Sequence, residues 1–172
     1  MDERCLGLVV YLKEPYPPVA VQEPNPVYAR AMQDNVGGIR SEMSLSALYT
    51  YNHIMTWQNP EVSRVFYDLG GVESHHLEIF SGLTRQLGGD PRLWAQVGTK
   101  KVYWSPKDNR YPLELGSLLE NAIIQENSLI EKYRQQLEVI GDPLIQANLL
   151  RVIADEEHHV VLLAHLYDLY AF

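Results

Sequence analysis

The chain has 172 residues, of which 46% are hydrophobic, and its formal net charge at pH 7 is −8. This length suits one domain with its own core, and no apolar run approaches the roughly 20 residues that cross a bilayer. The acidic balance argues against nucleic acid as a main partner, and an apolar start too short for a secretory signal favours the cytoplasm.

Residues 1 to 26 are predicted to form an extended arm. The stretch KEPYPPVAVQEPNP carries five prolines, which disfavour helix interiors and the centres of sheets. We expect this arm to lie over its own domain or over a partner subunit. Residues 27 to 172 are then expected to form a single domain.

A short helix and four long helices are predicted after the arm. The short helix begins at Asn25–Pro26, a cap followed by proline, and ends at Gly37 and Gly38. The long helices are expected over 39 to 58, from Asn59–Pro60 to 88, over 112 to 140, and from Asp142–Pro143 almost to the C-terminus. The short joints within the first and second pairs predict two antiparallel hairpins.

Residues 89 to 111 are predicted to form one long connection with little periodicity. A connection of this length can run past a whole helix of about 39 Å and join two helices that point the same way. A four-helix bundle with one such crossover is the ferritin-like architecture, so the predicted fold is all-α. The aromatic residues of this connection suit subunit contacts and favour a homodimer or a larger homo-oligomer; they are Trp94, Tyr103, Trp104 and Tyr111.

Two of the long helices carry a Glu-x-x-His pair within an otherwise apolar stripe. Glu73 and His76 share a face with leucine and phenylalanine, and Glu156 and His159 do the same near the C-terminus. An ionised carboxylate in an apolar core is costly unless it is paired. A bound cation would offset that cost.

The other two long helices each add one glutamate, and the two halves of the chain repeat one another. SEMSLSALY around Glu42 and QENSLIEKY around Glu126 share Glu-x-Ser-Leu-x-x-x-Tyr, and ESHH and EEHH share Glu-x-His-His. The spacing from Glu42 to Glu73 is 31 residues, and that from Glu126 to Glu156 is 30. We interpret this as an internal repeat of a helical hairpin.

These residues predict a site for two divalent metal ions, with bridging carboxylates and one terminal imidazole on each ion. Carboxylate and imidazole ligands suit iron or manganese. Cys5 is the only cysteine, which excludes an intrachain disulfide and a CxxC metal site. The predicted ligands are Glu42, Glu73, His76, Glu126, Glu156 and His159.

Other polar residues near the motifs are given plainer roles. Tyr49 and Tyr133 either donate hydrogen bonds to ligand carboxylates across the bundle or are core tyrosines with another partner. His53 is expected to be a partly buried histidine with a hydrogen bond rather than part of the site. Surface or supporting positions are expected for His75 and His158, and solvent exposure for Glu120, Asp155 and Glu157.

The motifs resemble those of the ferritin-like di-metal carboxylate superfamily over residues 39 to 170. AIIQENSLIEKY followed by IADEEHH is similar to the diiron domain of rubrerythrin. The earlier stretch YPPVAVQEPNPVYARAMQDNVGGIRSEMSLSALYTYN is similar to manganese catalases and related spore-coat proteins. The resemblance implies the same six ligands, and a hydrogen peroxide or dioxygen substrate.

The chain departs from both families at particular positions. Ile123 stands where rubrerythrins have an additional glutamate, and Arg40–Ser41 precede Glu42 where the catalase relatives have glycine. The paired CxxC motifs of a rubredoxin domain are also missing from the sequence. Because the side chain of Ile123 cannot bind a metal, the resemblance does not extend to ligand switching of the rubrerythrin kind.

The resemblance implies a peroxide-consuming oxidoreductase and leaves several alternatives. A peroxidase would need a redox protein as electron donor, whereas a catalase would use a second peroxide. The same site could instead serve as a ferroxidase in iron handling. A metal that only stabilises a coat or assembly protein is the alternative from outside enzymology.

Overall fold

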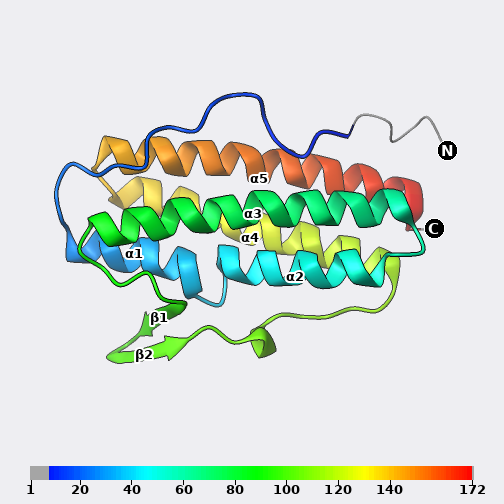
Figure 1. Ribbon diagram of the computed structural model, residues 1–172, viewed down its shortest axis with the longest axis horizontal. Coiled ribbons are helices and arrows are strands. Elements are labelled where there is room, and N and C mark those ends of the chain that lie inside the picture. The colour runs from blue at the N-terminus through cyan, green and yellow to red at the C-terminus, as the bar shows by residue number, and fades with distance from the viewer. Residues whose placement is uncertain (1–7, 172) are drawn as a thin grey trace.

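The computed structural model describes residues 8–171, so Cys5 lies outside the described part of the chain. Figure 1 shows a bundle of long helices with a strand pair beside it. The helices are α1 (Pro26–Gly37), α2 (Glu42–Met55), α3 (Pro60–Gln86), α4 (Leu115–Val139) and α5 (Pro143–Tyr170). The strands are β1 (Trp94–Val97) and β2 (Lys100–Tyr103), followed by a 3-10 turn at Pro106–Asp108. The predicted all-α class is confirmed.

Three of the helix starts are fixed by the predicted cap and proline pairs. The Asn25 side chain accepts hydrogen bonds from two backbone N–H groups at the start of α1, and Asp142 does the same for α5. Asn59 accepts one from Val62 at the start of α3. Proline is tolerated at the first helical position because an N–H group there would have no partner within the helix.

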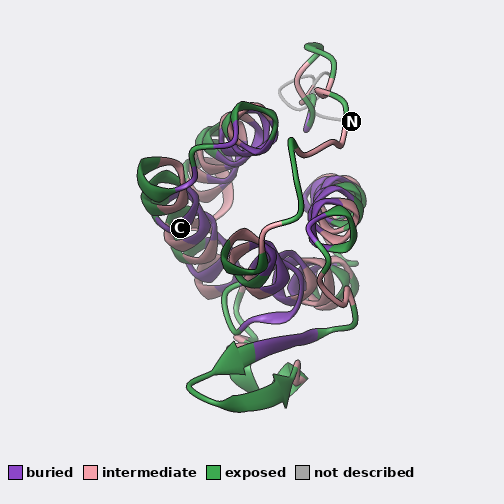
Figure 2. Ribbon diagram, turned by 90° about the vertical axis from the view of Figure 1, so that its left-hand side faces the viewer, coloured by how far each residue is buried: buried purple, intermediate pink, exposed green. Residues whose placement is uncertain are grey.

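The bundle consists of two antiparallel hairpins, α2–α3 and α4–α5, whose helices pack most extensively within each pair. Viewed along the bundle, buried residues lie on the inward faces of the helices and exposed residues on the outward faces (Figure 2). The core includes the large buried side chains Phe66, Phe80, Leu83 and Leu163. Among the described residues, no helix combines the length and the hydropathy that crossing a membrane requires.

The connection between α3 and α4 runs along the length of the bundle, so these two helices point the same way (Figure 1). The prediction of a crossover is therefore confirmed, but it was incomplete because the connection contains the antiparallel pair β1–β2. Gly98, with a φ of +61°, opens the two-residue turn between the strands. Trp94 is buried, and its backbone approaches Gly37 so closely that a Cβ there would lie 2.3 Å from the Trp94 nitrogen.

Residues 8 to 25 form neither helix nor strand and lie along the bundle. They are held by side chains of α3 and α5: Asn148 donates to the Pro18 carbonyl and Gln86 to the Val19 carbonyl. Arg151 on α5 donates to the carbonyls of Leu12 and Glu14. Of the two predicted positions for the arm, the structure therefore shows the one over its own domain.

Candidate metal centre

One buried polar cluster lies in the middle of the bundle, and all four long helices contribute to it. None of its six side chains has any exposed surface. α2 supplies Glu42, α3 supplies Glu73 and His76, α4 supplies Glu126, and α5 supplies Glu156 and His159. The structure thus brings together all six residues that the sequence singled out.

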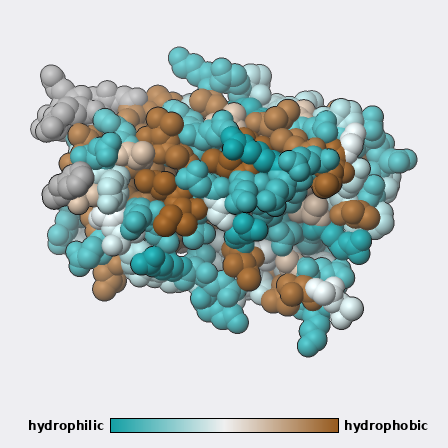
Figure 3. Space-filling view, turned by 180° about the vertical axis from the view of Figure 1, so that it is seen from behind, coloured by the Kyte–Doolittle hydropathy of each residue, from teal (hydrophilic) through white to brown (hydrophobic). Residues whose placement is uncertain are grey.

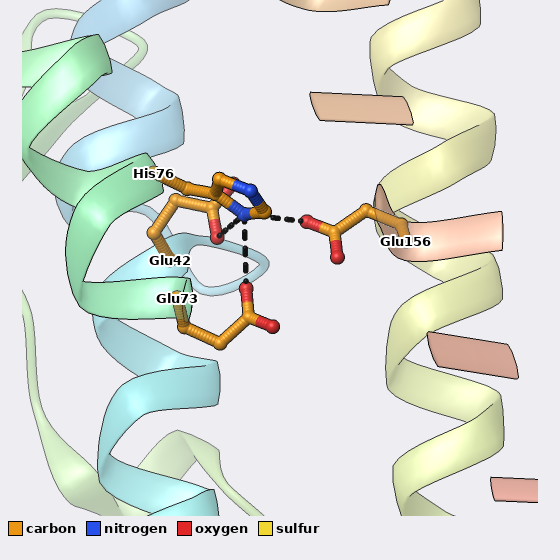
Figure 4. A group of neighbouring side chains, drawn as sticks. All are labelled: Glu42, Glu73, His76 and Glu156. Carbon is orange, nitrogen blue, oxygen red and sulfur yellow. Dashed lines mark hydrogen bonds and ion pairs between the residues drawn. The ribbon is translucent and has the colours of Figure 1, made fainter. Parts of the chain in front are cut away.

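The cluster divides into two groups of four that share two members. One group is Glu42, Glu73, His76 and Glu156, drawn in Figure 4, and the other is Glu73, Glu126, Glu156 and His159. Within each group, one potential ligand atom per residue lies within 4.8 Å of all the others. Each group could therefore hold one cation, with Glu73 and Glu156 facing both.

The two histidines present the same ring atom to the carboxylates. His76 Nδ1 lies 3.3 Å from Glu73 Oε2 and 3.2 Å from Glu156 Oε1. His159 Nδ1 lies 3.1 Å from Glu73 Oε1 and 2.9 Å from Glu156 Oε2. The opposite ring nitrogen of each histidine points outward, where it finds its own hydrogen-bond partner.

Those outward partners differ between the histidines. His76 Nε2 lies 3.1 Å from Asp155 Oδ2, whereas His159 Nε2 lies 3.0 Å from the backbone carbonyl of Val10. A carbonyl can only accept, so Nε2 of His159 carries the hydrogen and donates it. The neutral ring then has a free lone pair on Nδ1, as a metal ligand requires.

The chemistry of the cluster fits two divalent cations. Five carboxylate oxygens of the cluster accept no hydrogen bond from any group outside it, namely Glu42 Oε2, Glu73 Oε1, Glu126 Oε2 and both oxygens of Glu156. Leaving buried acceptors unsatisfied is costly, and more so for charged groups. Four ionised glutamates also balance the charge of two divalent ions. Bound metal would therefore remove both the cost of the unsatisfied acceptors and the cost of the buried negative charge.

Without metal, the cluster holds protons in its place. Burial raises the pKa of Glu42 and Glu126 well above the usual value, and the nearby charge of Glu156 raises both further. Burial alone would raise the pKa of Glu73 as well, but hydrogen bonds with His159 and His76 lower it to about 2.

Both histidines gain basicity from the same carboxylates. Burial alone would lower the pKa of His76, but the charge of Glu156 and a hydrogen bond with Asp155 raise it well above 6.5. Burial alone would also lower the pKa of His159, but the hydrogen bond with Glu126 is the first of several contacts that raise this pKa well above 6.5. Metal binding must therefore displace protons from the cluster.

Two tyrosines join the hairpins across the cluster. The Tyr49 hydroxyl on α2 donates to Glu126 on α4, and the Tyr133 hydroxyl on α4 donates to Glu42 on α2. Both rings are fully buried. Of the two sequence interpretations, the structure shows the hydrogen bond to a cluster carboxylate for both residues.

Asp155 was expected to be exposed, and this prediction is wrong. It is fully buried, accepts a 2.5 Å hydrogen bond from Tyr16 and pairs at 2.5 Å with Arg151. Burial would raise the pKa of Asp155, but hydrogen bonds from His76, Arg151 and Tyr16 lower it below its usual range. The arm covers the face of α5 on which Asp155 lies, a contact that no single-helix pattern reveals.

Tyr16 and Arg151 also belong to this region, although the sequence motifs do not include them. The Arg151 guanidinium lies 4.1 Å from the centre of the Tyr16 ring, and the Tyr16 hydroxyl is 3.3 Å from His76 Nε2. Burial and the hydrogen bond to Asp155 raise the pKa of Tyr16 to about 12. The spacing of Arg151 and Asp155, four residues apart on one helix, was the available signal.

The remaining polar residues lie outside the cluster, as expected. His53 is partly buried and bonds to Ser63, and His75 is exposed. His158 contacts the Val9 carbonyl of the arm at 2.6 Å, which is a supporting position. Glu120 and Glu157 are exposed.

The bundle, its crossover and its carboxylate cluster define the chain as a member of the ferritin-like di-metal carboxylate superfamily. The rubrerythrin family model matches residues 37–167, so the chain belongs to the rubrerythrin family. This match includes all six cluster residues.

Two solved structures share the fold. The wild-type KatB manganese catalase from Anabaena superposes with a TM-score of 0.82 at 18% identity, covering 92% of this chain and 78% of KatB. A KatB structure from Anabaena PCC7120 gives the same score and identity, with 93% and 80% covered. No curated protein matches the chain in sequence.

Proposed function

We propose that the chain is a di-metal oxidoreductase that reduces or disproportionates hydrogen peroxide. The observation that carries this proposal is that Glu73 and Glu156 belong to both four-residue groups, so that two ions would share two carboxylates. Two iron or two manganese ions held there would supply the electrons exchanged with the peroxide O–O bond. The family match and the shared fold with a manganese catalase support the same reaction class.

Each cluster residue then has a distinct role. Glu73 and Glu156 belong to both groups and would be shared by the two ions. Glu42 and His76 would complete the first position, and Glu126 and His159 would complete the second. Tyr133 and Tyr49 hold the terminal carboxylates Glu42 and Glu126 in orientation, which limits how far these two can move.

The burial of the cluster supports a small substrate. All six side chains are without exposed surface, and the arm covers the outer nitrogens of both histidines. Hydrogen peroxide and dioxygen are small enough to diffuse into such an interior. A surface cavity is lined by Val10, Tyr16, Val72 and His75 among others, and two of these residues, Tyr16 and Val10, contact the cluster histidines.

The experiment that tests this proposal combines metal analysis with peroxide turnover. Protein purified from its native host should hold two iron or manganese ions per chain. Oxygen release from peroxide without reductant identifies a catalase, and turnover that requires a reductant identifies a peroxidase. Bound metal with neither activity would contradict the proposal and favour iron handling or a structural role.

A matched pair of variants sets the control. Glu156→Gln removes a bridging carboxylate, whereas Glu157→Gln changes its exposed neighbour, which pairs with Arg134 on the surface. The first variant should abolish two-ion binding and turnover, and the second should leave both unchanged. Equal activity in both variants would count against the proposed centre.

We also propose that the protein acts in the cytoplasm as a homodimer or a larger homo-oligomer. Tyr103 and Tyr111 on the crossover are exposed, although Trp94 is buried within the chain itself. One face of the molecule also carries a cluster of hydrophobic side chains among hydrophilic ones (Figure 3). Light scattering on the purified protein would show a multiple of 19.7 kDa, and a monomer would refute this assembly.

A further inference from the structure

The two halves of the candidate metal centre repeat each other except in the group that supports each histidine. On α5, the residue before Glu156 is Asp155, and its carboxylate supports His76 on α3. The corresponding residue on α3, before Glu73, is Val72. The valine side chain has no hydrogen-bonding group, so the repeat cannot support His159 on α5 in the same way.

The arm supplies the missing acceptor. The Val10 carbonyl lies 3.0 Å from His159 Nε2. Val10 is buried in the core cluster, and the carbonyl before it accepts from His158 Nε2 at 2.6 Å. Two residues further on, Arg151 donates to the Leu12 carbonyl. The segment is thus held on both sides of the one carbonyl that contacts His159.

We propose that the arm is a functional part of the metal centre, with the Val10 carbonyl replacing the carboxylate that the repeat lacks and making the two metal positions unequal. This inference rests on the proposed two-ion function. Val10 is a positioning residue because it acts on a metal ion only through His159.

The inequality follows from the chemistry of the two acceptors. A carboxylate that accepts the outer N–H of a histidine draws the proton more strongly than a neutral amide carbonyl does. The inner nitrogen of His76 is therefore the stronger electron donor. The position of Glu42 and His76 should take up the first ion, and the position of Glu126 and His159 should take up the second, more weakly bound ion.

The same comparison shows how the arm could be replaced. Asp155 reaches from α5 to His76 on α3, so by the symmetry of the repeat residue 72 faces from α3 toward His159 on α5. Val10 and Val72 line the same surface cavity, so the two residues lie on the same side of the bundle. Aspartate is close to valine in size, so Val72→Asp could supply an acceptor to His159 without the arm.

The test makes the Val10 carbonyl a weaker hydrogen-bond acceptor in the full-length chain and leaves every side chain unchanged. Replacing Tyr11 by its α-hydroxy acid turns the Val10–Tyr11 amide into an ester, whose carbonyl is a poorer acceptor. The control ester replaces Ala20 and weakens the Val19 carbonyl, which accepts from Gln86 far from the cluster. Anaerobic titration with Mn²⁺, followed by the electron paramagnetic resonance of free Mn²⁺, gives both dissociation constants.

The ester at position 11 should raise the dissociation constant of the more weakly bound Mn²⁺ ion by about tenfold, because outer partners of ligand histidines typically contribute that much. The tighter constant should change less than about twofold, and the control ester should change neither. Adding Val72→Asp to the ester chain should restore most of the lost affinity. Asp155→Asn should instead raise the tighter constant.

Other results would overturn the proposal. The proposal is contradicted if the ester weakens the binding of both Mn²⁺ ions equally or weakens neither. It is also contradicted if the control ester causes the same loss of affinity, or if Val72→Asp does not restore the affinity. If the ester chain does not fold, Val10→Gly removes the buried side chain that anchors this carbonyl, and the same Mn²⁺ titration with and without Val72→Asp shows whether the affinity for the second ion is lost and restored. An unmodified chain that binds two ions of neither Mn²⁺ nor Fe²⁺ would instead refute the proposed function itself.

Discussion

The Tyr133 hydroxyl on α4 donates a hydrogen bond to Glu42 on α2, and so joins the second hairpin to the first at the cluster. Tyr49 makes the reciprocal contact from α2 to Glu126 on α4. Each half of the repeat therefore orients a cluster glutamate of the other half. The centre depends on how the hairpins are docked as well as on its ligands.

Tyr133→Phe should weaken the centre without changing its ligands. It removes one hydroxyl from a fully buried ring and leaves Glu42 without its donor. We expect a loss of about 1 to 3 kcal/mol in the free energy of unfolding and about tenfold weaker metal binding. Thermal unfolding and metal titration would measure these effects, with the exposed Tyr67→Phe as the control. Equal behaviour of the two variants would show that the contact is unimportant.

The metal-free protein should lose stability as the pH rises. The pKa values of Glu42, Glu126, His76 and His159 are raised in the folded state, so their stabilising contributions are lost as the pH rises through the folded values. Glu73 has the opposite sign, because its pKa is lowered to about 2 and its contribution is lost on acidification.

The unfolding temperature of the metal-free protein should therefore be highest near about pH 5 and fall through neutrality. The metal-loaded protein should show the reverse trend above that pH, because protons compete with the metal. Unfolding temperatures in chelator and in added Mn²⁺ between about pH 5 and 9 would test this. Parallel curves for the two forms would mean that the metal does not replace protons in the cluster.

Asp155→Asn should destabilise the protein much more than a similar change at the surface. Asp155 and Arg151 form a buried pair four residues apart at 2.5 Å, and breaking such a pair costs about 3 kcal/mol or more. Arg64 and Asp68 form the same pair on α3 at 2.7 Å, with the Arg64 side chain 71% exposed. Asp68→Asn should cost less than about 1 kcal/mol. Chemical denaturation measures both, and similar losses would contradict the account of Asp155.

Two glycine-to-alanine changes should act in opposite directions. A Cβ at Gly37 would lie 2.3 Å from the Trp94 nitrogen and 2.6 Å from the Leu93 carbonyl carbon, so the strand pair must move. A Cβ at Gly71, in the middle of α3, meets nothing within 4 Å. Gly37→Ala should destabilise by about 1 to 3 kcal/mol, and Gly71→Ala should stabilise by up to about 1 kcal/mol. Loss of stability in Gly71→Ala would show that this site is not open.

The cluster could be predicted from sequence because it repeats. A single Glu-x-x-His pair is common by chance, but Glu73–His76 and Glu156–His159 recur in register with Glu42 and Glu126. The helical period then fixes which side chains share the inward face. The cap and proline pairs located three helix starts to the residue.

The contacts made by the arm could not be predicted in this way. Asp155 is adjacent to Glu156 on α5, and it is covered by Tyr16, which lies 139 residues earlier in the chain. The support of His159 by Val10 uses a backbone carbonyl, which every residue has. The strand pair was missed for a different reason: Gly98 gave a turn signal, but its flanking strands are four residues each and largely exposed.

Anomalous diffraction from crystals of the Mn²⁺-loaded protein tests the central claim most directly. We predict two peaks inside the bundle, roughly 3.5 to 4 Å apart, both within coordination distance of Glu73 and Glu156, with His76 on one ion and His159 on the other. A fully loaded protein whose manganese lies elsewhere, or that holds one ion or none between these glutamates, would contradict the account.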